Sequence, residues 1–150
     1  MSTTEVGFYH LTRQPLEAVL PRLLEKAYAA GHRILVHCAG PEQLKRLDQQ
    51  LWTYDDASFL PHGSEDKALQ PVLLTTSQDE RANRPDLLAA LDGLDLDRIG
   101  DFARVLYLFE EGDSERLAAA RASWSALRGR DGVTRTYWQQ DERGRWVKKQ

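Results

Sequence analysis

Cysteine and long apolar runs are nearly absent from this sequence. Cys38 is the only cysteine among the 150 residues, which excludes a disulfide framework and a zinc site made of cysteines. No stretch of about 18 apolar residues occurs, so no membrane-spanning helix is predicted. The opening Met1-Ser2-Thr3-Thr4-Glu5 lacks the basic segment and apolar run of a secretory signal. We therefore expect a cytoplasmic protein without a membrane segment.

Glycine-rich phosphate loops are also missing. The P-loop pattern G-x-x-x-x-G-K-[ST] does not occur, and the turn after the first predicted strand reads Thr12-Arg13-Gln14-Pro15 instead of G-x-G-x-x-G. Without glycines at that turn, the backbone cannot closely approach a pyrophosphate. The G-x-S-x-G turn of α/β-hydrolases is absent too. These absences argue against a nucleotide cofactor and a hydrolase site.

The remaining reactive residues form no predicted catalytic or metal-binding cluster. Cys38 has no neighbouring group that would clearly activate its thiol, which favours a buried, inert cysteine. The histidines lack ligand spacing, and each is interpreted as a structural residue with satisfied hydrogen bonds. They are His10, His32, His37 and His62. We therefore expect a non-catalytic protein that holds no metal and no cofactor.

Charge is unevenly distributed along the chain. The sequence is 41% hydrophobic and 29% charged, which is enough apolar material for one folded domain. Residues 1–115 contain 11 Lys and Arg against 20 Asp and Glu, whereas residues 116–150 contain 9 against 3. The net charge of −3 therefore combines an acidic body with a basic last quarter. Either this quarter forms a face that attracts anions, or it is a solvated tail.

Strand and helix patterns alternate along the chain. Short apolar runs predict strands, and apolar residues at three- and four-residue spacing predict helices. Their alternation with short connections predicts a single-domain α/β fold with a mainly parallel sheet covered by helices. The predicted strands are Val6–Leu11, Arg33–Cys38, Pro71–Thr76 and Arg104–Phe109, and the predicted helices are residues 15–30, 41–52 and 114–128.

Several segments have less regular patterns. Residues 53–67 are predicted to form a loop, and residues 77–85 a polar, exposed segment. Asp86–Asp92 fits a helix by composition, but its length of seven before Gly93 also allows a buried strand, which we favour. Residues 133–138 are expected to form an edge strand, and the polar residues 139–150 to be partly loose.

The last predicted helix combines an apolar stripe with basic residues. At 100° per residue, the apolar residues Leu117, Ala120, Trp124 and Leu127 fall on one side. Arg121 and Arg128 lie two turns apart on one flank of that stripe. Such a surface could receive an apolar group next to a carboxylate. The alternative interpretation is a core-facing stripe bordered by solvated arginines.

Aromatic residues gather near the predicted loop. Trp52, Tyr54 and Phe59 fall within eight residues. Large aromatics beside a loop either fill the core or anchor a partner protein. Three of them in this region lead us to expect that at least one is exposed.

Several short motifs follow one another between about residue 6 and residue 146. They are Phe8-Tyr9-His10-Leu11, Leu47-Asp48 before Leu51-Trp52, Ser58-Phe59-Leu60-Pro61-His62-Gly63, Gln70-Pro71-Val72, and Tyr137-Trp138-Gln139-Gln140 followed by Gly144 and Trp146. In sequence and order, these motifs resemble the chi subunit of bacterial DNA polymerase III.

The resemblance implies a three-layer, Rossmann-like domain without enzymatic activity. A chi-like protein would be an accessory subunit of the clamp-loader complex. It would bind the acidic C-terminal tail of single-stranded-DNA-binding protein and a psi-type subunit, and would meet DNA only indirectly. Two alternatives stay open: a small nucleotide- or phosphate-binding α/β enzyme, and a domain that binds single-stranded DNA through Trp138, Trp146 and the basic last quarter.

The resemblance also assigns two candidate sites. The tail site would use Arg121, Trp124, Ser125 and Arg128 on the last helix, where Ser125 stands at a position at which the family is expected to have a lysine. Arg128 could compensate for that missing charge. The psi-type partner would contact Trp52 and Phe59.

Overall fold

The computed structural model describes residues 3–55 and 59–150. The elements follow in the order β1 Thr4–Leu11, α1 Leu16–Ala29, β2 Ile34–His37, α2 Pro41–Thr53, β3 His62–Gly63, η1 Lys67–Leu69, β4 Val72–Thr75, β5 Leu87–Ala90, η2 Ile99–Asp101, β6 Arg104–Glu110, α3 Ser114–Ala126, β7 Val133–Gln140 and β8 Trp146–Lys148. The predicted strands and helices are therefore confirmed, with shifts of a few residues at their ends.

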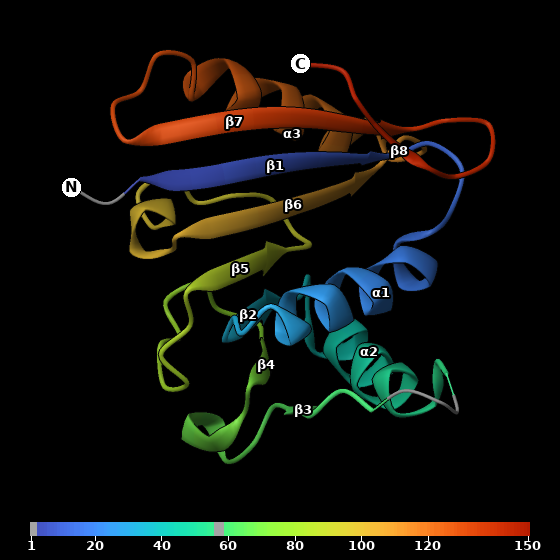
Figure 1. Cartoon of the computed structure of the whole chain (residues 1–150), viewed down its shortest axis with the longest axis vertical. Helices are drawn as coiled ribbons and strands as arrows, with labels where there is room; N and C mark the ends of the chain where they lie inside the picture. The colour runs from blue at the N-terminus through green and yellow to red at the C-terminus, as the bar shows by residue number, and fades with distance from the viewer. Residues whose placement is uncertain (1–2, 56–58) are drawn as a thin grey trace.

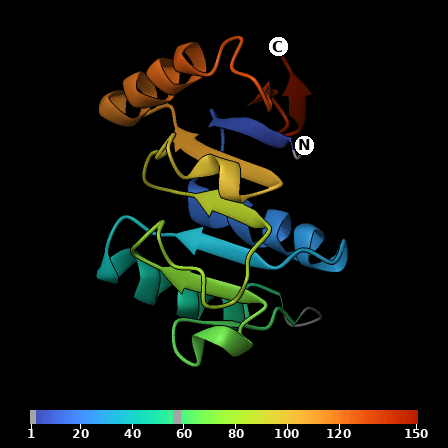
Figure 2. The same cartoon turned by 90° about the vertical axis from the view of Figure 1, so that its left-hand side faces the viewer.

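A single twisted sheet runs through the molecule. Within the described residues it has eight strands in the order β3-β4-β2-β5-β6-β1-β7-β8. All neighbouring pairs are parallel except β7 and β8. Figure 2 shows the progressive rotation between successive strands, as expected from the right-handed twist of each strand. The prediction of an α/β fold with a mainly parallel sheet is confirmed.

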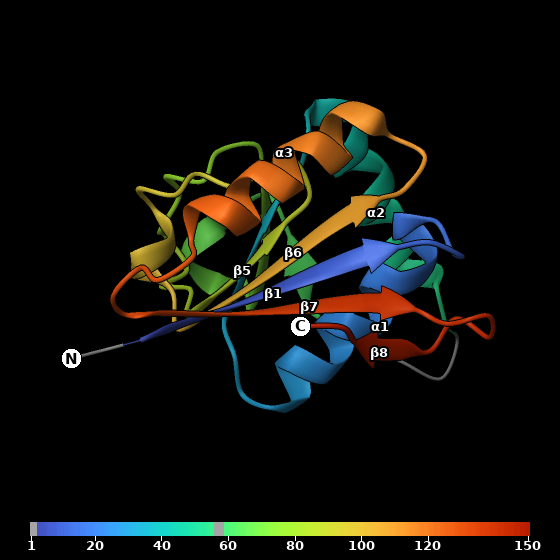
Figure 3. The same cartoon turned by 90° about the horizontal axis from the view of Figure 1, so that it is seen from above.

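Helices cover both faces of this sheet, which makes three layers. Side chains alternate along β1, so Tyr9 and Leu11 belong to the core beneath α1 and α2. Val6 and Phe8 belong to the core on the other face, together with Ala120 of α3. Figures 1 and 3 show α1 and α3 on opposite sides of β6, β1 and β7. The α3 face contains the candidate tail site.

The segment with two interpretations, Asp86–Asp92, forms a central strand. All four residues of β5 are buried. The strand lies between β2 and β6, and Leu87 and Leu88 face opposite cores. A strand buried on both faces has apolar side chains in succession, which explains why its composition also resembles that of a helix. The preference for a strand is confirmed.

The C-terminal segment differs from its predictions. β7 was expected to be an edge strand, but it lies between β1 and β8. The residues expected to be partly loose instead form the end of β7 and the antiparallel strand β8. Beyond β8, the Lys149 amide donates to the Tyr137 carbonyl at 2.7 Å. The turn at Asp141–Gly144 allows these polar residues to pair because an antiparallel partner needs only a short connection.

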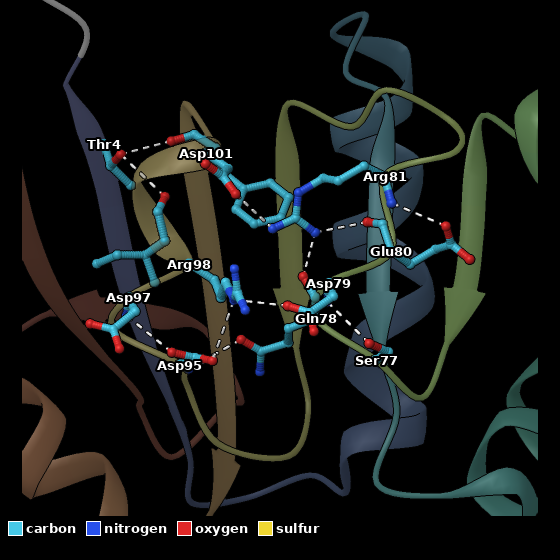
Figure 4. A network of polar contacts seen from close by, with 12 residues as sticks. Thr4, Ser77, Gln78, Asp79, Glu80, Arg81, Asp95, Asp97, Arg98 and Asp101 are labelled. Atoms are coloured by element: carbon cyan, nitrogen blue, oxygen red, sulfur yellow. Dashed lines mark hydrogen bonds and ion pairs between the residues drawn. The ribbon is translucent and has the colours of Figure 1, made fainter.

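Residues 77–85 are packed more closely than their polarity predicted. Gln78 and Asn83 are buried, and Asn83 Nδ2 donates to the carbonyls of Ile34 at 3.0 Å and Gln70 at 3.1 Å. Figure 4 shows Arg81 and Arg98 connecting this segment to the acidic residues around η2. Gln78 in turn bonds the His37 ring, the Gly93 carbonyl and the Asp95 amide, so the buried amide groups of this segment tie it to the neighbouring strands and loops.

The loop predicted over residues 53–67 contains a short strand that sequence analysis missed. β3 has only two residues and pairs with β4 at the edge of the sheet. Residues 56–58 of this loop lie outside the described residues, and so does Ser58 of the family motif. A two-residue strand has no recognisable periodicity, so its pairing depends on the neighbouring β4.

Candidate functional site

α3 begins where the local sequence predicts and ends two residues earlier than predicted. The Asp113 side chain accepts a hydrogen bond from the Arg116 amide at 3.1 Å and caps the first turn. The helix ends at Ala126, and Gly129 follows with a φ of +69°, a conformation that glycine adopts without strain. Arg128 therefore lies two residues beyond the end of the helix, so the predicted extension of the helix to Arg128 is wrong.

The apolar stripe of α3 faces the sheet as predicted. Ala120 and Leu127 are buried, and Leu117 and Trp124 are partly buried against the same core. Arg121 and Ser125, on the flank of the stripe, are exposed. The interpretation as a core stripe bordered by solvated arginines is therefore correct for the stripe itself.

An open cavity of about 700 Å³ lies beside this flank. Three of the four residues assigned to the tail site line it, namely Arg121, Trp124 and Ser125, whereas Arg128 does not. The other lining residues come from the ends of β1 and β6, from β7 and from the segment after β8: His10, Glu111, Tyr137, Gln139, Lys149 and Gln150.

Trp124 forms an aromatic wall of the cavity. Its ring packs edge-to-face with Phe8 at 5.2 Å and with Tyr137 at 5.4 Å between centroids. The Arg135 guanidinium lies 3.9 Å from the centroid of the Trp124 ring and donates a hydrogen bond to the Trp124 carbonyl. Trp124 is therefore held in a fixed orientation, and Arg135 adds positive charge behind it.

Arg121 is the basic group of α3 at the cavity. Within residues 3–55 and 59–150 it makes no ion pair, in contrast to Arg116, which bridges Asp92 and Asp113. Burial is the largest influence on the pKa values of two neighbouring groups, lowering that of His10 and raising that of Tyr137. The charge of Arg121 adds to the downward shift of His10 and opposes the upward shift of Tyr137. Glu111 is the acidic side chain of the cavity wall and opposes Arg121 in both cases.

His10 differs from the other histidines. It was expected to be a structural residue with satisfied hydrogen bonds, and its Nδ1 does share one with the Tyr137 hydroxyl at 3.0 Å. Its Nε2, however, is buried and makes no hydrogen bond among the described residues. By contrast, both ring nitrogens of His62 face carbonyl oxygens, of Leu60 and Asp48.

Sequence reasoning missed the residues that β1, β6 and β7 contribute. His10 and Tyr137 both occur in the family motifs, but they are separated by 127 positions and only the pairing of β1 with β7 brings them together. The basic last quarter gave a partial signal, because Arg121, Arg135 and Lys149 all belong to it. Residues 116–150 therefore contribute to α3, β7 and β8 and do not form a solvated tail.

The second predicted surface contains Trp52 and Phe59. Their side chains are 54% and 68% exposed, and their ring centroids are 5.8 Å apart. Trp52 also packs on the buried His62 at 4.5 Å between centroids. The prediction that at least one aromatic residue near this loop is exposed is confirmed, since both Trp52 and Phe59 are. The paired rings, which we call the aromatic patch, lie at the end of α2 beside β3.

The nucleotide alternative can be examined at the edge where β5 and β6 end. Open α/β sheets bind nucleotides where successive connections leave to opposite faces. Here Arg116 lines a cavity of about 380 Å³ with Asp92 and Asp113. Arg116 pairs with Asp92 at 2.9 Å and with Asp113 at 3.2 Å, and it donates to the Leu91 carbonyl at 2.8 Å. Its charge is thus balanced by two carboxylates, which disfavours a phosphate at this position.

Comparison with known proteins identifies the family. The family described as "DNA polymerase III chi subunit, HolC" matches residues 3–134. The chain belongs to this family. It is 34% identical over 120 residues to DNA polymerase III subunit chi of Pseudomonas aeruginosa, an alignment that covers 77% of this chain and 84% of that protein.

More distant relatives carry the same description. DNA polymerase III subunit chi of Haemophilus influenzae is 25% identical over 127 residues, covering 81% of this chain and 88% of that protein. The Escherichia coli subunit chi is 29% identical over 79 residues, covering 51% of this chain and 54% of that protein. The resemblance found from the short motifs is thus confirmed. The chain is a replication protein of the DNA polymerase III type, and it belongs to a family of accessory subunits that are not enzymes.

The family match ends at residue 134. Tyr137 and Lys149, which complete the cavity, therefore lie beyond the matched residues.

None of the helices in the described residues is both long and apolar enough to cross a membrane.

Proposed function

We propose that this chain is a replication adaptor that binds two partners on separate surfaces. The cavity beside α3 receives the acidic C-terminal tail of single-stranded-DNA-binding protein, and the aromatic patch receives a psi-type subunit of the clamp-loader complex. The observation that supports the first assignment most directly is the combination of a free cationic Arg121 with the aromatic wall of Trp124 in one open cavity.

The chemistry of the cavity matches that of an acidic peptide ending in phenylalanine. Arg121 can form a bidentate pair with a carboxylate, while the phenyl ring packs against Trp124 and Tyr137. Ser125 supplies no charge, but Lys149 lines the same cavity from the other side. Lys149, not Arg128, thus compensates for the charge that Ser125 does not provide. Arg128 contributes only a more distant, screened attraction.

The aromatic patch has the features of a protein-binding surface. Two large rings in contact are exposed at the edge of the sheet, and large aromatics are typical anchors of protein interfaces. Trp52→Ala and Phe59→Ala should each weaken the binding of a purified psi-type partner. Binding of the tail peptide should stay unchanged, because neither residue lines the cavity beside α3. If both variants bind the partner with the same affinity as the unsubstituted chain, this surface is rejected.

Isothermal titration calorimetry with a synthetic tail peptide tests the first assignment. We expect saturable one-to-one binding that weakens as salt rises, because part of the attraction is between exposed charges. A peptide without its terminal phenylalanine should bind at least as poorly as the full peptide binds to Arg121→Ala, since it loses both the ring and the position of the carboxylate. Trp52→Ala provides the matched control for a distant aromatic substitution.

The same preparation distinguishes the alternatives. Binding of a naked single-stranded oligonucleotide at physiological salt, with no binding of the peptide, would favour direct DNA binding. Stabilisation by ATP, GTP or NAD in a thermal shift assay would favour the nucleotide-binding alternative. Failure of the tail peptide to bind at low salt would reject the tail site.

A further inference from the structure

His10 has an unexplained polar atom at the edge of the candidate tail site. Its side chain is only 7% exposed, and its ring stacks on Phe109 with centroids 5.2 Å apart. The Tyr137 hydroxyl occupies Nδ1 at 3.0 Å. Nε2 is buried and has no hydrogen-bond partner among the described residues, yet His10 lines the cavity. A buried polar atom without a partner is unfavourable unless another group satisfies it.

The nearest charge to this nitrogen is a carboxylate. Glu111 Oε1 lies 3.8 Å from His10 Nε2, beyond hydrogen-bond distance, and the Glu111 side chain is 57% exposed. Glu111 directly follows β6 and also lines the cavity. A half-exposed glutamate can rotate toward solvent with little loss of contacts. Rotation of Glu111 would open the position near Nε2 to another carboxylate.

We propose that His10 is a second anion-binding residue of this cavity, whose Nε2 donates a hydrogen bond to a carboxylate of the bound acidic peptide in place of Glu111. This inference rests on the proposed tail-binding function and adds to it a contact from β1. The peptide carboxylates would then be divided between Arg121 on α3 and His10 on the sheet. Both residues line the one cavity, so a single short peptide can reach both.

Such a contact couples peptide binding to proton uptake. In the free protein, burial lowers the pKa of His10, Glu111 opposes this shift and Arg121 adds to it; the net direction is downward, so the ring is mostly neutral at pH 7. A peptide carboxylate next to Nε2 favours the charged ring and raises that pKa. The complex therefore binds a proton that the free protein lacks, and affinity falls as pH rises through the pKa of the complex.

The other charged groups around His10 do not imitate this response. They are Glu111 after β6, Arg121 on α3, Tyr137 on β7 and Lys149 after β8. An imidazole normally changes its charge between pH 5.5 and 8, whereas carboxylate, guanidinium, phenol and ammonium side chains do not. The carboxylates of the peptide also stay ionised in this range.

Calorimetry of the whole chain with the synthetic tail peptide tests the proposal. Titrations at pH 6.5 in PIPES and in imidazole, which differ in ionisation enthalpy, give the number of protons taken up. We expect uptake of a substantial fraction of one proton, and an affinity up to about tenfold higher at pH 5.5 than at pH 8, which corresponds to a pKa rise of about one unit on binding.

Three variants identify the group responsible. His10→Gln keeps a polar side chain but cannot take up a proton, so its affinity should be independent of pH. Glu111→Gln should bind the peptide several-fold more tightly, because a competing negative charge is removed. His32→Gln is the matched control, since His32 lies outside the cavity and pairs with Asp86 at 2.7 Å. It should show the same uptake as the unsubstituted chain.

The outcomes separate the two proposals. Peptide binding without proton uptake in the unsubstituted chain, or unchanged uptake in His10→Gln, would overturn the role of His10 and leave the tail site intact. No peptide binding at any pH would overturn both. If His10→Gln does not fold, as judged by circular dichroism, NMR titration of the His10 imidazole in the unsubstituted chain with and without the peptide decides instead, and a pKa of His10 that does not rise on binding overturns its role.

Discussion

Replacing Arg121 by alanine tests the position of the tail site most directly. Arg121 lines the cavity and makes no ion pair in the part of the chain that the structure describes, so in the free protein its removal breaks no salt bridge there. The free energy of unfolding should therefore change by less than about 0.5 kcal/mol, as for other surface substitutions. Any loss of peptide binding can then be attributed to the missing contact and not to misfolding.

The expected loss of affinity follows from the chemistry of the contact. Removing one partner of a hydrogen-bonded charge pair at a partly desolvated site costs about 2 kcal/mol. At 1.4 kcal/mol per factor of ten, this corresponds to a roughly thirty-fold larger dissociation constant for the peptide. Arg121→Lys should recover part of the loss, because an ammonium keeps the charge but not the bidentate geometry.

Arg128→Ala serves as the charge-matched control. It removes the same charge from the same end of the chain, but Arg128 lies after the end of α3 and outside the cavity. We expect at most a few-fold loss, which should disappear at high salt. Isothermal titration calorimetry of the three variants at two salt concentrations provides the comparison. Equal effects of Arg121→Ala and Arg128→Ala would refute the reasoning, because they would indicate a diffuse attraction without a defined site.

Three further predictions concern stability and reactivity. Asn83→Ala should lower the free energy of unfolding by about 2 kcal/mol in urea denaturation, because the carbonyls of Ile34 and Gln70 each lose a buried donor; an unchanged midpoint would contradict the packing of residues 77–85. Burial raises the pKa of the Cys38 thiol to about 12, so Ellman's reagent should react with it at pH 8 only after denaturation. The contribution of the protonated Cys38 thiol to the free energy of unfolding is fully present below about pH 9 and is lost as pH rises toward 12. Burial lowers the pKa of His37, so its contribution to stability is present above about pH 6.5 and is lost as pH falls. In denaturation experiments between pH 7 and 5, His37→Gln should therefore reduce the dependence of the free energy of unfolding on pH. The same pH dependence in the variant and the unsubstituted chain would exclude His37 as its source.

The C-terminal residues illustrate the limit of local patterns. The sequence predicts a strand at residues 133–138 from its own composition, and this strand exists as part of β7. That β7 lies inside the sheet depends on β8, whose three residues Trp146–Lys148 are polar or flanked by polar residues and give no periodic signal. The pairing arises from the turn geometry and from Trp146, which packs edge-to-face on Tyr9 at 5.1 Å between centroids. Long-range contacts of this kind override weak local preferences.

The sequence by itself determined those features that depend on neighbouring residues. The order of strands and helices, the cap of α3 by Asp113, its apolar stripe and the family motifs all rest on short spacings, which the chain specifies directly. Only the tertiary structure decided which residues meet at the cavity. Register between β1 and β7 brings His10 next to Tyr137, because strand pairing acts across distances that spacing along the chain does not encode. The tertiary structure also places Arg121 in the lining of the cavity and leaves Arg128 outside it.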